Sequence, residues 1–438
     1  MFSSTSPATV RSKAGAILRV TSGNFLEQFD FFLFGFYATY IAHTFFPASS
    51  EFASLMMTFA VFGAGFLMRP IGAIVLGAYI DKVGRRKGLI VTLSIMAAGT
   101  FLIVLIPSYQ SIGLWAPLLV LTGRLLQGFS AGAELGGVSV YLAEIATPGR
   151  KGFYTSWQSG SQQVAIMVAA AMGFALNALM EESAIREWGW RIPFLLSSVL
   201  VLLGLWIRKD IDETPDFKKV KQSGQVAKAP LRDTLKHHWR EVLIAAGLKV
   251  VETAPFYIFS TFVVSYATTM LTYQKSQALE AVTLGALVAT VMIPLMGLLS
   301  DKIGRQRMYA ASVFILGLFI VPWFMLLNTG TTWGIVLATV IAFGVLWAPV
   351  TAVLGTLCSE IFSANVRYTG ITLGYQLGAA LAGGTAPLIA TGLLAKYDGD
   401  WIPVAWYLAV TVVISLIAIF CASRVKRTTL LQAQPEHL

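Results

Sequence analysis

Cysteine and histidine are scarce in this chain of 438 residues, which contains two cysteines and four histidines. Cys358 and Cys421 lie in or near apolar stretches, and their spacing matches neither a zinc site nor a disulfide framework. The histidines fall in loops or near chain ends, where no nucleophile, base and orienting group recur together. The sequence therefore predicts no metal centre, no bound cofactor and no enzyme.

Charged residues are also few. They make up 12% of the chain, about half of the roughly 25% typical of soluble proteins, while 56% of the residues are hydrophobic. The mean hydropathy is +0.70. Apolar stretches recur that are long enough to cross a hydrocarbon layer of about 30 Å as helices. No small-residue cleavage site follows the short polar N-terminus, so the first apolar segment is expected to remain as a helix.

The apolar stretches predict an all-α membrane protein with twelve transmembrane helices in two bundles of six. The predicted helices cover residues 16–44, 53–78, 88–107, 115–143, 152–180, 191–208, 241–270, 278–299, 308–327, 333–357, 368–395 and 402–423. We expect residues 1–208 to form the N-terminal bundle and residues 241–438 the C-terminal bundle. The polar residues 209–240 are expected to link them.

Lysine and arginine are distributed unequally over the two sides of this arrangement. One side receives only Arg186, Lys275 and Lys396. The other side receives both termini, the linker and the remaining basic loops. Because basic loops stay in the cytoplasm, both termini and the linker are predicted to be cytoplasmic. The net charge of +10 is then a signal of topology and does not indicate nucleic-acid binding.

A short signature occurs twice, beginning at Gly77 and again at Gly297, 220 positions later. It reads Gly-x-x-x-Asp-Lys-x-Gly-Arg, and each copy lies between two apolar segments. A repeat at half the chain length in a membrane protein predicts two parallel halves. Such halves are typical of a carrier that rocks around a central site.

The signature also predicts one ionic latch at the cytoplasmic face of each half. An aspartate ends a helix just before a basic cluster, where its carboxylate can pair with arginine or with the N-terminus of a facing helix. A glutamate ends another helix at the matching position of each half. The N-terminal latch comprises Asp81, Arg85 and Glu144, and the C-terminal latch comprises Asp301, Arg305 and Glu360. The alternative is that these loops carry charge only for solvation and topology.

Several ionisable residues fall inside the apolar helices, where each costs at least about 2.5–3.5 kcal/mol and usually faces a cavity or a partner. At a rise of about 1.5 Å per residue, Asp30, Arg69 and Arg124 reach the same central layer. Glu27 shares a helix face with Asp30. Two cations and two carboxylates suit an anion bound by the arginines together with a proton on Asp30 or Glu27. The alternative is a salt-bridge network that only holds helices together.

Further polar residues are predicted to surround this layer. The substrate-binding candidates are Gln158, Gln162, Lys249, Tyr257, Tyr375 and Gln376, and the additional proton carriers are Glu134 and Glu252. The glycine-rich stretch 123–137 permits close helix contact and is not a phosphate loop, because no strand precedes it. The alternative for the polar residues is helix packing through interhelical hydrogen bonds.

Both copies of the signature resemble that of the major facilitator superfamily, and the resemblance covers the whole chain. Residues 23–30, 66–72, 124–128 and 187–194 more narrowly resemble the metabolite–proton symporter family, whose members carry citrate, dicarboxylates, shikimate and osmolytes. Residues 15–194 are similar to bacterial citrate– and tricarballylate–proton symporters. In the second half, residues 254–257, 366–370 and 373–376 look more like the shikimate branch.

The resemblance implies a proton-driven importer of an organic acid that works as a monomer in a bacterial inner membrane. Citrate, tricarballylate, a dicarboxylate and shikimate remain open as substrates. An exchanger or a proton-independent facilitator is the alternative within transporters. A membrane sensor would need a soluble output domain, and a channel would not need duplicated latches.

Overall fold

The computed structural model describes residues 7–49, 51–213, 218, 221–223, 230–362 and 367–432. Over these residues the chain is helical and contains no strand, as predicted. The helices before the linker are α1 (Pro7–Phe36), α2 (Ala38–Phe45), α3 (Glu51–Val83), α4 (Arg85–Leu105), α5 (Tyr109–Ile112), α6 (Trp115–Ile145), α7 (Lys151–Leu179), α8 (Glu182–Ala184), the π-helical η1 (Ile185–Gly189) and α9 (Arg191–Arg208). The later helices are α11 (Pro230–His237), α12 (Trp239–Tyr257), η2 (Ile258–Phe262), α13 (Val263–Met270), α14 (Lys275–Ile303), α15 (Arg305–Leu327), α16 (Thr332–Thr339), η3 (Val340–Trp347), α17 (Ala348–Ile361), α18 (Arg367–Gly378), η4 (Ala379–Gly383), α19 (Ala386–Lys396) and α20 (Ile402–Gln432).

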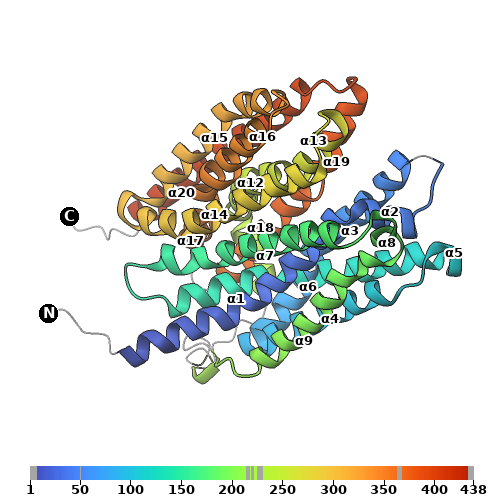
Figure 1. Ribbon diagram of the computed structural model, residues 1–438. Helices are drawn as coiled ribbons and strands as arrows, with labels where there is room; N and C mark the ends of the chain where they lie inside the picture. Colours follow the sequence, from blue (N-terminus) through green and yellow to red (C-terminus); the bar gives the residue numbers. More distant parts are fainter. Residues whose placement is uncertain are drawn as a thin grey trace, which may run out of the picture.

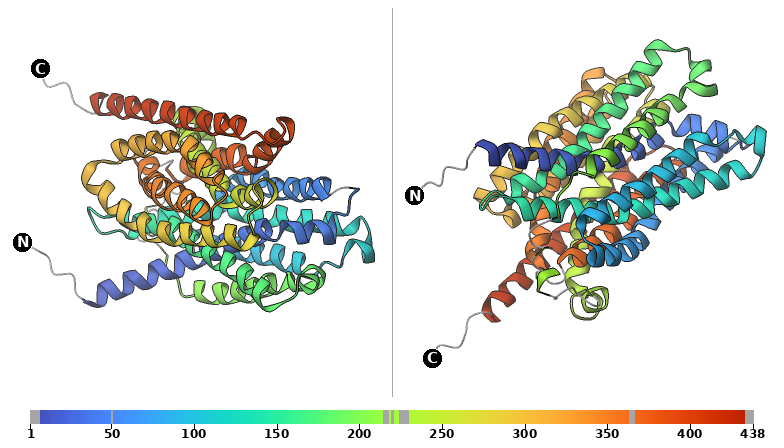
Figure 2. Two further views of the ribbon diagram at one scale, coloured as in Figure 1. Left: turned by 45° about the horizontal axis from the view of Figure 1, so that its top comes forward. Right: turned by 90° about the horizontal axis from the view of Figure 1, so that it is seen from below.

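The long helices form two groups that lie side by side (Figure 1). Helices α1 to α9 make up one group and α12 to α20 the other, and both chain ends emerge at the same end of the molecule in all views (Figures 1 and 2). Helix α7 packs along α14 and α17, and α3 packs against α18, so these helices join the groups. The arrangement is consistent with two bundles of six, although the exact division at residues 208 and 241 stays a prediction.

Ten of the described helical segments are long and apolar enough to cross a membrane. Each of them coincides with one of the twelve predicted spans. The other two predicted spans correspond to α1 with α2 and to α6. These helices contain buried acidic and basic side chains, which are Glu27, Asp30, Arg124 and Glu134.

Four of the predicted spans are interrupted rather than continuous. The first span breaks at Tyr37, between α1 and α2. Three spans after the linker contain the π-helical segments η2, η3 and η4. Pro255 precedes η2 within α12, where its missing N–H removes one helical hydrogen bond. Hydrophobicity alone does not locate such interruptions, because the side chains stay apolar through them.

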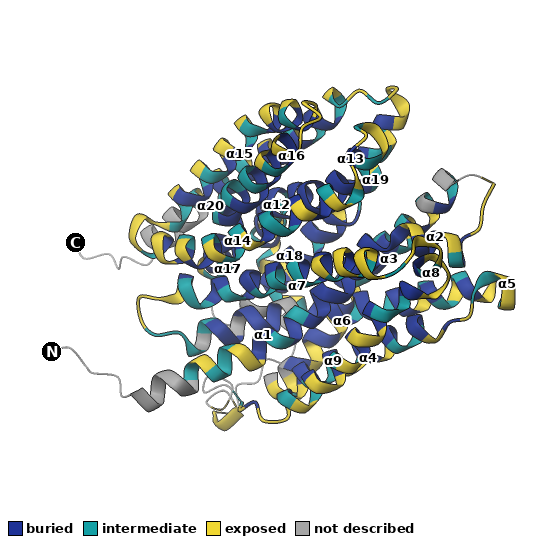
Figure 3. Ribbon diagram, viewed as in Figure 1, coloured by how far each residue is buried: buried dark blue, intermediate teal, exposed yellow. Residues whose placement is uncertain are grey.

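Exposed residues lie along the outer faces of the long helices (Figure 3), and many of them are large and apolar. On α9, Val199 and Trp206 are 62% and 64% exposed, and on α15, Leu318 and Met325 are 64% and 61% exposed. Apolar surface of this extent is unusual on a water-soluble monomer but is what a lipid-facing helix presents. The two groups of helices therefore present their apolar faces to the bilayer and their polar residues to each other.

The two copies of the repeated signature adopt the same backbone turn. Gly84 and Gly304 separate consecutive helices with φ angles of 105° and 102°, a region that L side chains rarely adopt. Each glycine also donates its N–H to the carbonyl four residues earlier, at 2.9 and 3.1 Å. The duplication read from the sequence is thus present in the backbone geometry.

Glycines bring α3 and α6 into close contact. A Cβ atom added at Gly128 would overlap the carbonyl of Gly65, and one added at Gly132 would overlap the carbonyl of Arg69. Backbone contact of this kind is available only to the smallest residue. The glycine-rich stretch therefore packs helices, as predicted, and it sets Arg69 on α3 close to Arg124 on α6.

Candidate functional site

Two buried arginines share one aromatic ring at the centre of the first group of helices. The guanidinium carbons of Arg69 and Arg124 lie 4.4 and 4.2 Å from the ring centroid of Phe31. Phe66 packs on Arg69 at 4.3 Å, and Phe34 packs on Arg124 at 4.5 Å. The aromatic faces stabilise the cations in an apolar setting. The structure therefore brings the two predicted arginines together around one ring.

Both guanidinium groups keep donors that the protein does not use. Arg69 is 2% exposed and Arg124 is fully buried. In the described part of the chain, Nε and Nη2 of each arginine have no hydrogen-bond partner. Buried donors normally find partners, because leaving one unpaired costs about 1–3 kcal/mol. Four guanidinium nitrogens without a partner around one ring are the strongest indication of an anion site in the described structure.

Asp30 is held by neutral donors rather than by direct contact with an arginine. The hydroxyls of Thr100 and Ser197 both donate to its carboxylate. Gln127 donates from Nε2 to Asp30 at 3.3 Å and accepts from Nη1 of Arg124 at 2.8 Å. Gln127 thus connects the aspartate to the arginine, so the charge state of Asp30 can influence the orientation of the guanidinium.

Glu27 is the least satisfied carboxylate in the described chain. It is 1% exposed, and neither side-chain oxygen has a hydrogen-bond partner among the described residues. Arg69, Arg208 and Glu134 are the charged groups that act on it at longer range. Burying a carboxylate without a hydrogen-bond partner is costly, so packing alone does not explain Glu27.

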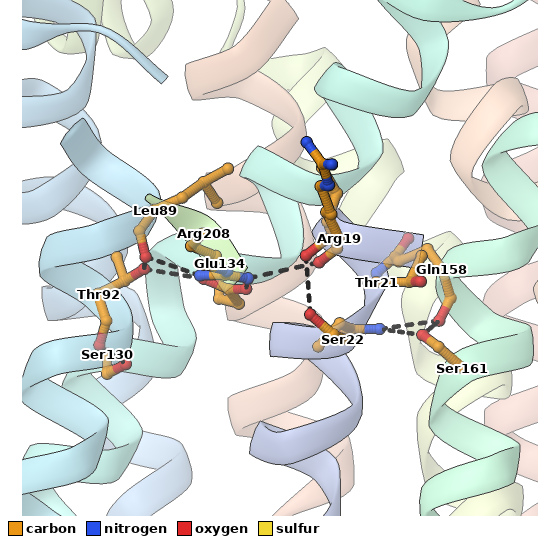
Figure 4. Close-up of polar contacts among 12 residues, drawn as sticks. Arg19, Thr21, Ser22, Leu89, Thr92, Ser130, Glu134, Gln158, Ser161 and Arg208 are labelled. Carbon is orange, nitrogen blue, oxygen red and sulfur yellow. Dashed lines mark hydrogen bonds and ion pairs between the residues drawn. The ribbon is translucent and has the colours of Figure 1, made fainter. Parts of the chain in front are cut away.

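Glu134 and Arg208 form a buried ion pair near the cytoplasmic end of the first group (Figure 4). Arg208 also donates to the carbonyls of Leu89 and Val20, at 2.7 and 3.4 Å. The hydroxyl of Thr92 donates to Glu134 at 2.8 Å. The glutamate predicted as an additional proton carrier therefore already has a fixed cationic partner.

The sequence analysis did not select Arg208 as a buried residue. It is the last residue of a predicted span and one of many basic residues toward the cytoplasm. Its side chain is nevertheless fully buried, with 0% exposure. A Cβ atom on Gly23 would overlap its guanidinium group. The glycine at position 23 on α1, which leaves room for the guanidinium, was the signal in the sequence that Arg208 turns inward.

The second group of helices contributes a smaller polar cluster. Lys249 pairs with Glu252 one turn later. Thr351 donates to Glu252 at 2.9 Å, and its hydroxyl oxygen lies 3.0 Å from the hydroxyl of Ser159 on α7. The ammonium of Lys249 lies 5.0 Å from the ring centroid of Tyr375. These predicted residues come together, but the charge of Lys249 is already neutralised by the carboxylate of Glu252.

Tyr257 joins the two clusters through its ring. It packs against Phe32, Phe62 and Phe66 with centroid distances of 6.3, 6.3 and 5.3 Å, and it is 4% exposed. Its neighbour Phe66 is the ring that covers Arg69. The tyrosine predicted to bind substrate therefore stands beside the arginines, although it belongs to the other group of helices.

Some polar side chains of α7 form hydrogen bonds to neighbouring helices, and others have no hydrogen-bond partner in the described chain. Gln158 accepts from Ser139 at 2.5 Å, and its backbone carbonyl accepts from Asn24 at 2.8 Å, so it ties α7 to α6 and α1. Gln162 is half-buried. Gln163 is fully buried, and neither of its amide atoms has a partner in the described chain. The substrate-binding candidates included the first two glutamines but not Gln163, which lies in the same polar run.

Gln376 reaches across from α18 to the first group. Its Nε2 donates to the carbonyl of Gly132 on α6 at 3.1 Å, and its Oε1 has no partner in the described chain. Gly132 is also the residue that packs against the backbone of Arg69. The predicted glutamine is thus part of the wall between the groups, one turn of α6 away from Gly128.

The C-terminal latch is assembled as predicted. Arg305 pairs with Asp301 at 2.9 Å and also with Glu360. The N–H of Gly152, in the first turn of α7, donates to Asp301 at 3.2 Å. The aspartate therefore meets both an arginine and a helix N-terminus. The side chains of the N-terminal latch, Asp81, Arg85 and Glu144, lie outside the described residues.

Polar contacts between the two groups gather toward the cytoplasmic end. They include Gly152 with Asp301 and Thr155 with Thr356, whose hydroxyls are 3.4 Å apart. A cavity of about 20 Å³ between α3, α11 and α18 has mostly apolar walls and does not include the arginines. Because Arg69 and Arg124 are almost completely buried, the central cluster is closed to solvent in this conformation.

Comparison with known proteins decides the family. The chain matches the Major Facilitator Superfamily over residues 20–383 and 255–437. The chain belongs to this superfamily. A citrate–proton symporter from Klebsiella pneumoniae is 54% identical over 421 residues, which cover 95% of this chain and 94% of the relative. A shikimate transporter from Escherichia coli is 32% identical, covering 91% of this chain and 92% of the relative.

A solved proton–xylose symporter of the superfamily shows the same fold, with a TM-score of 0.74. It is 16% identical, and the alignment covers 94% of this chain and 96% of that chain. Membership in the superfamily confirms the prediction of a multi-pass membrane transporter and excludes the enzyme alternative. The relatives include both branches that the sequence resembles.

Proposed function

We propose that the protein is a proton-coupled symporter that imports citrate or a related tricarboxylate across a bacterial inner membrane by alternating access. The observation that carries this proposal is the pair of buried arginines around Phe31, whose Nε and Nη2 atoms lack partners in the described chain. The 54% identity to a citrate–proton symporter supports the substrate and the coupling ion. Small-molecule substrate and protons are the partners; lipid surrounds the protein, and we expect a monomer.

In this proposal Arg69 and Arg124 bind two carboxylates of the anion. A guanidinium fork matches a carboxylate in two-point geometry, and the aromatic rings keep competing water away. Tyr257, which packs on Phe66, and the unpaired Gln163 are further candidates for contact with the anion from one side. Gln376 and Lys249 are the candidates from the second group of helices. Gln158 has its polar atoms engaged in packing, so it supports the wall rather than the substrate.

Protons are carried by Asp30 and Glu27. Protonating Asp30 would remove the charge that Gln127 relays to Arg124, which frees the guanidinium to bind a carboxylate. Glu27 has no hydrogen-bond partner in the described chain to stabilise its charged form. Glu252 serves the second group in the same way through Lys249. Glu134 is the least suited of the predicted proton carriers, because Arg208 already neutralises it.

A dicarboxylate is the second candidate substrate. Of the three central cations, Lys249 is paired with Glu252, which leaves two arginines without a carboxylate partner in the described chain. Two free cations suit two carboxylates, so a dicarboxylate would satisfy them as well as a tricarboxylate carrying one proton. Proton-independent exchange and shikimate transport are further outcomes that one uptake experiment separates.

The experiment is uptake of labelled citrate into proteoliposomes, with and without an inward proton gradient. Citrate accumulation that requires the gradient and is blocked by unlabelled tricarballylate is the expected result. Gradient-driven uptake of succinate or shikimate without citrate uptake would replace the substrate but keep the coupling. Equal citrate uptake without any gradient would remove proton coupling and leave Asp30 and Glu27 as structural charges.

A further inference from the structure

A second cavity lies at the outer end of the molecule, where α1, α2 and α7 meet α14. It holds about 10 Å³, close to the smallest space that accepts one water molecule. Among the residues that line it, the polar ones are Tyr37, Tyr40, Asn177 and Lys275. Because α14 belongs to the second group of helices, the cavity spans the boundary between the two groups.

The hydroxyl of Tyr37 has an unfilled hydrogen-bonding position in this cavity. Tyr37 is 2% exposed, and its hydroxyl has no partner in the described chain. A Cβ atom added at Gly173, which also lines the cavity, would lie 3.6 Å from this hydroxyl. A buried hydroxyl without a partner costs about 1–3 kcal/mol, so its location at the cavity wall indicates a ligand or water there.

Lys275 supplies a positive charge to the same cavity. Its ammonium lies 5.1 Å from the ring centroid of Tyr40, which is a cation–π contact between the two groups of helices. No ion pair is formed by this lysine among the described residues. The charged group that acts on it is Glu182, which itself pairs with Arg186 at 3.4 Å on the surface. The ammonium is therefore available to an anion that enters from outside.

We propose that Lys275 and Tyr37 form an outer capture site for a carboxylate group of the transported anion. Lys275 and Tyr37 line the same small space. An ammonium and a phenolic hydroxyl can both donate to a carboxylate oxygen, and the positive charge of the lysine disfavours a cation there. An anion held there would reach the arginines after the outer ends of the two groups separate. The choice of citrate as this anion rests on the proposed function, whereas the anion site itself rests on the cavity.

The first test measures citrate uptake kinetics at the outer face. Lys275→Gln is expected to raise KM about tenfold or more and to leave kcat nearly unchanged, because a charge-assisted contact made before transport is lost. Lys275→Arg should restore a KM near that of the unsubstituted protein. Lys396→Gln is the matched control, since Lys396 is also an outer lysine over a tyrosine ring, 5.6 Å from Tyr397, but is exposed.

An equal rise in KM for Lys275→Gln and Lys396→Gln would show general surface attraction and overturn the capture site. An unchanged KM for Lys275→Gln would overturn it as well. A loss of kcat alone would mean that Lys275 and Tyr40 only hold the two groups together.

The second test measures anion binding at the proposed site by cysteine labelling, without measuring transport. Asn177→Cys, on the exposed rim of the cavity, is labelled in right-side-out vesicles with a membrane-impermeant maleimide, and the unsubstituted protein gives the background from Cys358 and Cys421. Citrate, tricarballylate or sulfate should slow labelling, and the added change Lys275→Gln should abolish this protection. Lipid phosphate is present both with and without the added anion, so it does not account for protection that depends on that anion.

No protection by any of these anions would overturn the capture site. Protection in a protein that shows no gradient-driven citrate uptake would keep the site and reject the proposed function. The two proposals therefore fail separately.

Discussion

At the scale of single residues, the main feature is a pair of arginines that lie close together. Among the described residues, neither of them forms an ion pair with a carboxylate. Arg69 and Arg124 each lie within 4.5 Å of the Phe31 ring centroid, and rings rather than carboxylates surround them. Cation–π contacts contribute on the order of 0.5–2 kcal/mol each, which is less than a buried ion pair would. The arrangement leaves the cations with unsatisfied attraction for an anion.

Substituting either arginine should therefore remove binding. Arg124→Ala is expected to lower citrate kcat/KM about 10- to 100-fold or more, because a charged hydrogen-bond donor is lost from the buried site. Arg69→Lys should retain the charge but lose the fork, so KM should rise more than kcat falls. Uptake into proteoliposomes and citrate binding in detergent both measure the effect.

Arg186→Ala serves as the control for this pair. Its side chain is 51% exposed and forms only a surface pair with Glu182. Uptake by this variant should stay near that of the unsubstituted protein. Intact binding in both Arg69→Ala and Arg124→Ala would contradict the proposed site.

The Glu134 and Arg208 pair should behave in the opposite way, as a contribution to stability. Arg208→Met leaves a buried carboxylate uncompensated, which costs about 3–5 kcal/mol when one partner of a buried pair is removed. The melting temperature in detergent should fall clearly in this variant. The double variant Arg208→Met with Glu134→Leu should recover much of the loss, because neither charge remains.

A different result would give Glu134 a role in proton transport rather than in stability. If Glu134→Gln left the melting temperature unchanged but abolished gradient-driven uptake, Glu134 would carry protons as the sequence analysis allowed. Thr92→Val is a milder control, since it removes one neutral donor to Glu134 at 2.8 Å without exposing a charge.

The central residues could be predicted because burying charge is expensive and therefore visible in an apolar sequence. Arg69 and Arg124 stood out within long apolar runs, and the rise per residue placed them at one depth. Arg208 could not be recognised in this way, since a basic residue at a cytoplasmic helix end is expected in solvent. Gln163 lay within a polar run, and only the packing shows which glutamine of that run is left unpaired.

At the scale of the helices, close backbone contact positions the arginines. Gly128→Ala would place a methyl group on the carbonyl of Gly65, which forces α3 and α6 apart. Overpacking of this kind costs about 1–3 kcal/mol. The melting temperature and citrate affinity should both fall, because the spacing of Arg69 and Arg124 changes with the helices.

Gly392→Ala on α19 is the matched control for this prediction. An added Cβ there meets no atom within 4 Å. Alanine in a helix is about 0.5–1 kcal/mol more favourable than glycine, so this variant should be as stable or more so. Equal effects of both substitutions would mean that the α3–α6 contact does not set the site.

Ten of the twelve spans and their approximate ends followed from the apolar runs, but the interruptions of the helices did not. A π-helical turn such as η2 keeps the same apolar composition and changes only the hydrogen-bond register. Pro255 marks one such place, whereas η3 contains no proline. Tertiary packing decides these positions, so periodicity alone could not find them.

At the scale of the whole molecule, the described conformation is closed at the cytoplasmic end. The C-terminal latch joins α14, α15 and α17, and the contact from Gly152 adds α7 from the other group of helices. A carrier must break the contacts between groups to open inward. Asp301 takes part in both the ionic latch and the contact between the two groups, so a change at this residue affects both.

Weakening the C-terminal latch should therefore shift the molecule toward an inward-open state. Asp301→Asn removes the charge that both Arg305 and the N-terminus of α7 attract. Spin labels at the exposed positions Lys151 and Lys302 should report a longer and broader distance in this variant than in the unsubstituted protein. Glu360→Gln should give a smaller shift, because it leaves the contact of Asp301 with Gly152 in place.

Arg307→Ala tests whether loop charge alone produces the shift. Arg307 is an exposed basic residue in the first turn of α15 and belongs to neither ion pair of the latch. Its substitution should leave the distance distribution unchanged. If Arg307→Ala lengthened the distance as much as Asp301→Asn, the loop would act through its net charge and not through a specific latch. An unchanged distance in Asp301→Asn would show that apolar contacts between α7 and α14 hold the cytoplasmic end closed without the ionic pairs.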